Sequence, residues 1–199
     1  MPIIINLRGT SGSGKTSAAR RFLDFPNATL TRRLTSPKGR VSEKVAGYGI
    51  TVPELSHTLY LVGAYTNICG GLDSMGTQEE HADLITKAYA AGGNVLCEGL
   101  LLSSVSSGAT VPKAMIDLAG KDRVIFAFLD TPLELCIERV KQRRAERGEE
   151  KPFNETNTRK KFEDTQAARR RLIDEGCRVE DIDHNEPAVN LYRLFKENE

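Results

Sequence analysis

The stretch Gly9-Thr10-Ser11-Gly12-Ser13-Gly14-Lys15-Thr16 decides the fold of this 199-residue chain. It fits the pattern G-x-x-x-x-G-K-[ST] at every fixed position. A short β-branched run at residues 3–7 precedes it and helix-forming residues 15–24 follow it, so the local order is strand, tight loop, helix. Such a loop turns successive backbone N–H groups inward at the start of a helix and makes an anion-binding nest. The stretch therefore predicts a phosphate-binding loop.

Each residue type in the loop has a chemical reason to be there. Gly9, Gly12 and Gly14 let the backbone wrap phosphates without a Cβ clash. Lys15 is expected to contact the β- and γ-phosphates, and Thr16 to give its hydroxyl to Mg²⁺. The alternative is a Gly/Ser turn with a solvated lysine, which the flanking strand and helix disfavour. The nucleotide-binding backbone would include Thr10, Ser11 and Ser13.

Outward from this loop, short apolar strands alternate with helices along the chain. Continuously apolar strands are typical of a parallel sheet that is covered on both faces. We expect one α/β domain over residues 1–199, a three-layer sandwich with a mostly parallel sheet. The Gly- and Pro-rich residues 34–56 read as an irregular insertion over the sheet edge, within which 48–52 could pair with 57–65 as a hairpin. The other expected strands are residues 28–33, 94–97, 123–129 and 177–182.

Composition excludes several classes of protein. With 28 Lys and Arg against 27 Asp and Glu, the net charge is +1, which argues against a charge-driven nucleic-acid binder. The cysteines lack C-x-x-C spacing, so neither a zinc site nor a disulfide framework is supported. No signal peptide or membrane-length apolar run is visible, and we expect a cytoplasmic protein with reduced thiols and no membrane partner. The four cysteines are Cys69, Cys97, Cys136 and Cys177.

The chain resembles the P-loop kinases of small substrates over most of its length. The resemblance rests on GTSGSGKT at 9–16, VLCEGLL at 95–101, LDTPLELCIERVKQRR at 129–144 and CRVEDIDHNEP at 177–187. It implies ATP as phosphate donor, an arginine-bearing lid over the triphosphate, and an Asp-rich strand with a following proline near the adenine.

Arginines at helical spacing support a lid at residues 139–156. Side chains at i, i+4 and i+8 share one helix face. Guanidinium groups match the charge and geometry of a transferring phosphoryl group. The alternative is a solvated face that pairs with neighbouring acids. The arginines are Arg139, Arg143 and Arg147, with Arg144 beside them, and we expect Arg139 and Arg143 to bind nucleotide.

Two acids are candidates for the chemistry at the acceptor and at the metal. Glu98 follows the strand at 94–97, at the carboxyl edge where open α/β sheets bind ligands. Asp73 follows Gly70 and Gly71, which would let the backbone bend close to a substrate. We expect Asp73 to be the acceptor-side base and Glu98 the metal-side acid. The reverse assignment stays open, as does an Asp73 that only caps a turn.

A narrower resemblance concerns the acceptor. Residues 62–73, VGAYTNICGGLD, are similar to a loop of phage P-loop kinases that act on 5-hydroxymethyluracil in DNA. It implies a DNA acceptor with a modified pyrimidine and a location in the host cytoplasm. Small-nucleotide kinases and polynucleotide 5′-hydroxyl kinases remain alternatives, followed by a non-kinase P-loop NTPase. No N-K-x-D motif supports a GTPase.

Basic clusters and tyrosines are the candidates for contacts with DNA. The basic clusters could follow a DNA backbone or could be solvated surface. The tyrosines could stack on an extruded base. The clusters are Arg32, Arg33, Lys38, Arg40 and Lys44, residues 159–161, and residues 169–171; the tyrosines are Tyr48, Tyr60 and Tyr65.

Overall fold

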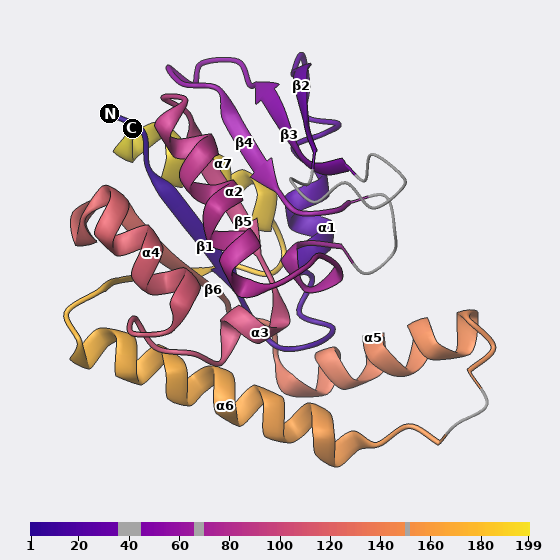
Figure 1. The fold of residues 1–199 in the computed structure, drawn as a ribbon. Helices are drawn as coiled ribbons and strands as arrows, with labels where there is room; N and C mark the ends of the chain where they lie inside the picture. The colour runs from indigo at the N-terminus through magenta and orange to yellow at the C-terminus, as the bar shows by residue number, and fades with distance from the viewer. Residues whose placement is uncertain (36–44, 66–69, 150–151) are drawn as a thin grey trace.

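A computed structural model describes residues 1–35, 45–65, 70–149 and 152–199. The described residues form a seven-stranded sheet with helices on both faces, which confirms the expected three-layer α/β fold (Figure 1). The strand order is β2-β3-β4-β5-β1-β6-β7. The strands are β1 (Ile4–Arg8), β2 (Thr29–Thr35), β3 (Val45–Thr51), β4 (Leu59–Val62), β5 (Asn94–Glu98), β6 (Val124–Leu129) and β7 (Arg178–Ile182).

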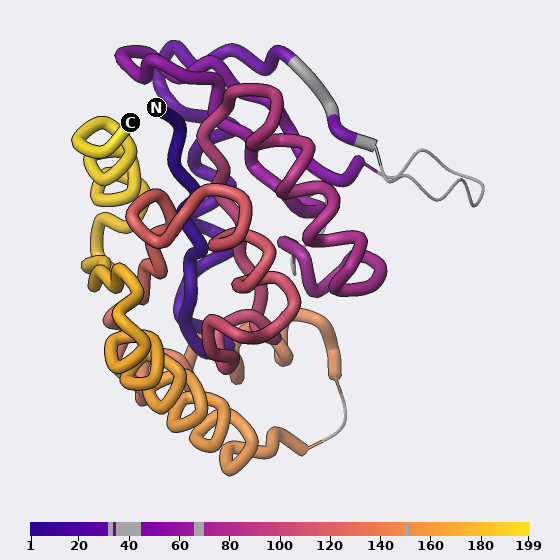
Figure 2. The backbone as a smooth tube through the Cα atoms, turned by 60° about the vertical axis from the view of Figure 1, so that its left-hand side comes forward, coloured from indigo at the N-terminus to yellow at the C-terminus, as the bar shows by residue number. Residues whose placement is uncertain are grey.

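The five strands β4, β5, β1, β6 and β7 are parallel to one another. Strands β2 and β3 add an antiparallel edge beside β4. Because β1 lies between β5 and β6, its carboxyl end brings the loop that follows it to the middle of the sheet edge. Both chain termini lie close together in Figures 1 and 2, at the end of β1 away from that loop.

Helices cover the two faces because side chains of the central strands alternate between two cores. Ile5 and Leu7 of β1 pack with Phe22 and Phe195 on the face of α1 and α7, whereas Ile4 faces the core beneath α2 and α4. The helices are α1 (Lys15–Arg20), α2 (Gln78–Ala90), α3 (Leu100–Ser103), α4 (Thr110–Ala119), α5 (Leu133–Glu146), α6 (Glu155–Asp174) and α7 (Pro187–Asn198), with the 3₁₀ turns η1 (Leu72–Ser74) and η2 (Lys121–Arg123).

The segment 34–56 differs from the expected irregular insertion. It contains β3, which extends the sheet between β2 and β4 instead of lying over its edge, and the expected pairing with the 57–65 segment is present. A Cβ on Gly47, within this Gly- and Pro-rich segment, would lie only 2.6 Å from the carbonyl oxygen of Leu61. The glycine marks close approach of two strands and not a turn. Residues 36–44 lie outside the described part of the chain.

Helices α5 and α6 lie side by side below the sheet in Figure 1. Lys141 pairs with Glu155 at 3.2 Å, and Arg159 pairs with Glu134 at 3.0 Å, so ion pairs join the two helices. The start of α5 has no side-chain cap. Pro132 is the N-cap residue, and the Thr131 hydroxyl instead makes a tertiary hydrogen bond, described below.

Candidate active site

The predicted phosphate-binding loop lies between β1 and α1, so the expected order of strand, loop and helix is present. Gly12 has φ +82°, and a Cβ at this position would overlap the carbonyl oxygen of Cys136 on α5. Only glycine meets both demands without strain. The segment between β6 and α5 also holds the loop, because the Thr131 hydroxyl donates a 2.8 Å hydrogen bond to the Ser13 carbonyl oxygen.

Lys15 lies buried inside the loop. Its ammonium group donates to the carbonyl oxygens of Gly9 at 2.7 Å and Thr10 at 3.1 Å. Burial lowers the pKa of Lys15, and the nearby Glu98 carboxylate partly opposes that shift. A buried lysine held only by carbonyl oxygens is suited to bind an anion, which would replace those neutral partners with a charged one.

Thr16 and Glu98 meet where α1 begins and β5 ends. The Thr16 hydroxyl donates to Glu98 Oε1 at 2.9 Å, and the glutamate is 2 % exposed. Burial raises the pKa of Glu98 to about 7, while Lys15 and the Thr16 hydrogen bond act in the opposite direction. Hydroxyl and carboxylate oxygens are the ligands that Mg²⁺ prefers, so this donor set fits that ion.

Asp73 stands in η1, beside the first turn of α3. Its carboxylate accepts hydrogen bonds from the backbone N–H groups of Leu100 and, at 3.1 Å, Leu101. The segments that carry Asp73 and Glu98 pack closely against each other, and glycines make room for both carboxylates. A Cβ on Gly71 would overlap Glu98, and a Cβ on Gly99 would lie 3.0 Å from Asp73 Oδ1. The structure thus brings both candidate acids to one edge of the sheet.

These groups line one cavity of about 710 Å³. Arg139 and Arg143 enter it from α5, whereas Arg147 is not among its lining residues and lies 3.7 Å from Glu149. Arg143 Nε is buried and has no partner among the described residues. The full lining is Ser11–Ser17, Arg20, Gly70, Asp73, Ser74, Glu98, Leu100, Arg139, Gln142, Arg143, Glu146, His184 and Pro187.

Sequence reasoning missed several lining residues. Arg20 is one helical turn beyond Thr16, so i, i+4 spacing could have found it. Its guanidinium donates to the Tyr65 carbonyl oxygen at 3.1 Å. His184 lies in the stretch 177–187 quoted above, but no local pattern singles it out, because its ring is held by Asp130, 54 residues away.

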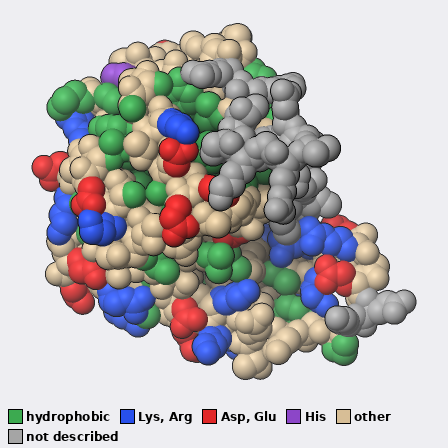
Figure 3. All heavy atoms as spheres, viewed as in Figure 1, with side chains coloured by type: hydrophobic (Ala, Val, Ile, Leu, Met, Phe, Trp, Pro, Cys, Tyr) green, Lys and Arg blue, Asp and Glu red, His purple; other side chains and the backbone are tan. Residues whose placement is uncertain are grey.

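The structure describes only some of the residues that the sequence offers as candidates for DNA contacts. Tyr48, Tyr60 and Tyr65, the candidates for stacking on an extruded base, are all buried in the structure. Lys38, Arg40 and Lys44 lie outside the described residues, and the side chains of Arg32 and Arg33 are not described. Arg169 pairs with Asp181. Figure 3 shows the face of the molecule that Figure 1 presents, and over its described part positive and negative side chains are interspersed.

Comparison with known proteins identifies similar chains from bacteriophages. No protein-family model matches the chain. It is 33 % identical to a 5-hmdU DNA kinase of Pseudomonas phage PaMx11, over 92 % of this chain and 91 % of that one. It is 26 % identical to a 5-hmdU DNA kinase of Delftia phage PhiW-14, over 95 % and 76 % of the two chains. A 5-hmdU DNA kinase of Pseudomonas phage M6 is 28 % identical, over 98 % and 97 %. Within the described residues, no helix is both long and apolar enough to cross a membrane.

Proposed function

The chain belongs to the phage 5-hmdU DNA kinases, and from that premise we infer that it transfers the γ-phosphate of ATP to the hydroxymethyl group of 5-hydroxymethyluracil in DNA. The observation that carries this inference is the 33 % identity over 92 % of the chain. The buried Lys15 and the Thr16–Glu98 hydrogen bond support it, because both belong to a cavity suited to phosphoryl transfer.

The phosphate groups of ATP would lie in the loop from Gly9 to Thr16. Backbone N–H groups and the Lys15 ammonium would bind the β- and γ-phosphates. Arg139 and Arg143 would close on the phosphates from α5, since both line the same cavity. Residues around 139–156 would serve as the lid.

A magnesium ion fits beside the phosphates. Thr16 and Glu98 would hold it, the threonine through its hydroxyl and the glutamate directly or through water. When bound, it would neutralise charge on the phosphates. Glu98 would then be the acid on the metal side.

Asp73 would serve as the base on the acceptor side. The hydroxymethyl oxygen forms a bond to the γ-phosphorus, the bond from that phosphorus to the oxygen of ADP breaks, and the hydroxyl proton passes to the Asp73 carboxylate. The hydrogen bonds from Leu100 and Leu101 hold the carboxylate in place while it lines the cavity. A purely structural Asp73, which only caps α3, is the alternative.

An acceptor panel tests the proposal. Purified protein and γ-labelled ATP are incubated with duplex DNA containing 5-hydroxymethyluracil, thymine DNA with 5′-hydroxyl ends, free nucleosides and free monophosphates. We expect label only in the first. Transfer to it should weaken as salt rises, because contacts with the DNA backbone release counterions. Label confined to monophosphates or to 5′ ends would overturn the assignment of the acceptor.

A further inference from the structure

The cavity extends to both sides of the phosphate-binding loop. Glu98 ends β5 on one side of β1, whereas His184 follows β7, which lies beyond β6 on the other side. Both residues line the cavity, together with the loop between them. The candidate acids Asp73 and Glu98 occupy the first side, so the phosphate acceptor belongs there. The base of the phosphate donor is then left with the side of His184.

The His184 ring is held in one orientation by Asp130. Oδ1 of Asp130 accepts from the His184 backbone N–H at 2.8 Å and faces Nδ1 of its ring at 2.9 Å. An ionised carboxylate can only accept hydrogen bonds, so Nδ1 of the neutral ring carries the proton. Nε2 is therefore a bare acceptor.

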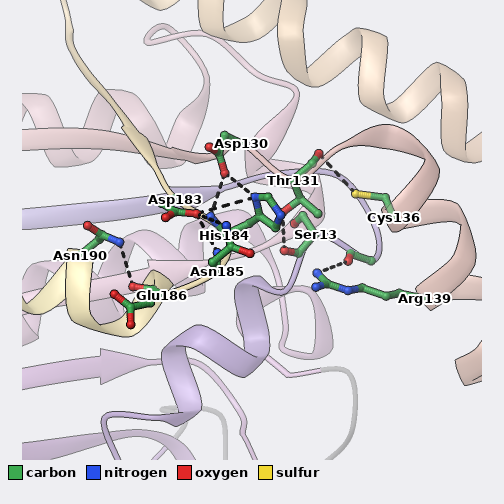
Figure 4. A network of polar contacts seen from close by, with 11 residues as sticks. Ser13, Asp130, Thr131, Cys136, Arg139, Asp183, His184, Asn185, Glu186 and Asn190 are labelled. Atoms are coloured by element: carbon green, nitrogen blue, oxygen red, sulfur yellow. Dashed lines mark hydrogen bonds and ion pairs between the residues drawn. The ribbon is translucent and has the colours of Figure 1, made fainter.

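The neighbouring carboxylate is already engaged. Asp183 Oδ1 accepts from the backbone N–H of Asn185 at 2.9 Å and from its side-chain amide at 2.8 Å, and lies 3.9 Å from His184 Nδ1. This turn orders the loop that carries His184. Figure 4 shows His184 between Asp130 and Asp183, with Arg139 on the far side of Ser13.

Nε2 of His184 remains available to a ligand. The side chain is 18 % exposed, and no hydrogen bond joins Nε2 to any residue that the structure describes. A fixed acceptor at the donor-base side of the cavity distinguishes purines by their 6-substituent. Adenine presents an amino donor there, whereas guanine and hypoxanthine present a carbonyl oxygen that would face the nitrogen lone pair.

We propose that His184 selects the base of the phosphate donor, with Nε2 accepting a hydrogen bond from the 6-amino group of adenine, and that Asp130 acts as a positioning residue by fixing the tautomer of His184. The proposal rests on the proposed function, because it takes the donor to be a purine triphosphate bound in the phosphate loop. It adds the reason why that donor is ATP.

Binding of nucleotides without any acceptor tests the proposal. Dissociation constants of the Mg²⁺ complexes of adenosine, purine riboside and inosine triphosphates are measured by calorimetry at pH 8.5. Purine riboside lacks the 6-substituent, so it removes the donor without adding an acceptor. We expect adenosine triphosphate to bind tightest and inosine triphosphate weakest, with dissociation constants that differ by about tenfold or more. The first gains a hydrogen bond to His184, whereas the second makes an unfavourable contact with it.

Three variants separate hydrogen bonding from charge and from packing. His184→Phe keeps a ring and should abolish the preference for adenosine over inosine. Asp130→Ala frees the tautomer and should reduce the preference. Asp130→Asn can still accept from Nδ1 through its amide oxygen and should retain it. Thermal melting identifies folded variants, and if Asp130→Ala fails to fold, His184→Phe decides.

Equal binding of the three nucleotides to the wild-type chain would overturn the proposal, as would a preference that survives His184→Phe. Either result leaves the kinase assignment standing, because transfer to DNA is measured separately. Conversely, if 5-hydroxymethyluracil DNA is not the acceptor, the nucleotide preference is still measured, since this assay contains no acceptor.

Discussion

Thr16 donates a 2.9 Å hydrogen bond to Oε1 of Glu98 and so ties the phosphate-binding loop to the end of β5. The Glu98 side chain is 2 % exposed, and burial raises its pKa to about 7, so its ionised form is disfavoured in the ligand-free protein. The buried charge costs stability in the ligand-free protein. We take this cost as the mark of a group kept for binding a cation and not for holding the fold together.

Glu98→Gln should stabilise the metal-free protein and impair catalysis. Burial raises the folded-state pKa of Glu98 to about 7, above its usual value of 4.5. The folded protein therefore binds a proton that the unfolded chain has released between these values, and the free energy of unfolding falls as pH rises through that window. At pH 8 the glutamine variant should be more stable by about 1–3 kcal/mol.

The measurement is urea unfolding of both proteins with EDTA, at pH 8 and at pH 4.5. The difference should shrink toward zero at the lower pH, where both side chains are uncharged. Phosphate transfer by the variant should fall by about 10–100-fold, the usual cost of losing an outer partner of a metal. A variant that is less stable at pH 8 would contradict the account.

Gly71→Ala should damage the site beyond its cost to the backbone. Gly71 has φ +81°, and a Cβ there would overlap the carboxylate of Glu98. Gly120 has φ +82° with nothing within 4 Å of its Cβ position, so Gly120→Ala is a control matched in conformation. Both variants should lose about 1–3 kcal/mol of stability, because each position combines a positive φ with an extended ψ that essentially only glycine adopts. Only Gly71→Ala should lose phosphate transfer. Comparable activity in the two variants would show that the close approach of Gly71 to the Glu98 carboxylate is not needed for transfer.

Arg143→Ala should lower kcat more than it weakens ATP binding. Arg143 lines the cavity, and its Nε is buried without a partner in the described structure, which fits a group that gains its partner when the phosphates are in place. We expect kcat to fall by at least about tenfold, below the full worth of an arginine at a phosphoryl-transfer site.

Arg144→Ala is the matched control for this prediction. Arg144 is the next residue of α5 and pairs with Glu149 at 2.8 Å. Its removal should change kcat by less than about twofold, as for most surface substitutions. If Arg143→Ala raises KM while kcat stays constant, the arginine only binds the ground state.

Asp73→Asn should reduce transfer by about 10²–10⁴-fold if Asp73 accepts the proton of the acceptor hydroxyl. The affinity for ATP should stay nearly constant, because the phosphate loop is untouched. The change also weakens one hydrogen bond to α3, so melting is measured beside kinetics. Asp117→Asn, on the exposed side of α4, is the control. Near-normal kcat in Asp73→Asn would leave only the capping role.

Local sequence was enough to predict the phosphate loop and the position of Glu98. The loop is a contiguous motif, and Glu98 ends a strand that must neighbour β1 in a parallel sheet. The layers followed from the alternation of apolar strands and helices. In each of these cases the deciding interactions are close in sequence or are imposed by the topology.

Long-range contacts explain what the sequence did not predict. The Thr131 hydroxyl donates a hydrogen bond to the carbonyl oxygen of Ser13, 118 residues away. Arg8 is a fully buried cation that donates to the Val105 carbonyl oxygen at 2.6 Å and lies 4.6 Å from the ring centre of Phe126. No spacing along the chain reveals such partners, because tertiary packing alone brings them together.

Identification of the phosphorylated nucleoside is the most direct test of the central claim. Duplex DNA containing 5-hydroxymethyluracil is incubated with Mg²⁺, ATP and either the wild-type chain or Lys15→Ala. The DNA is then digested by nucleases, without phosphatase, to nucleoside 5′-monophosphates and analysed by mass spectrometry. We expect the 5′-monophosphate of 5-phosphomethyl-2′-deoxyuridine from the wild type and at least about a hundredfold less from Lys15→Ala, the typical cost of removing one preorganised charge-stabilising donor. Only the 5′-monophosphate of unmodified 5-hydroxymethyl-2′-deoxyuridine after reaction with the folded wild-type chain, or equal product from Lys15→Ala, would contradict the account.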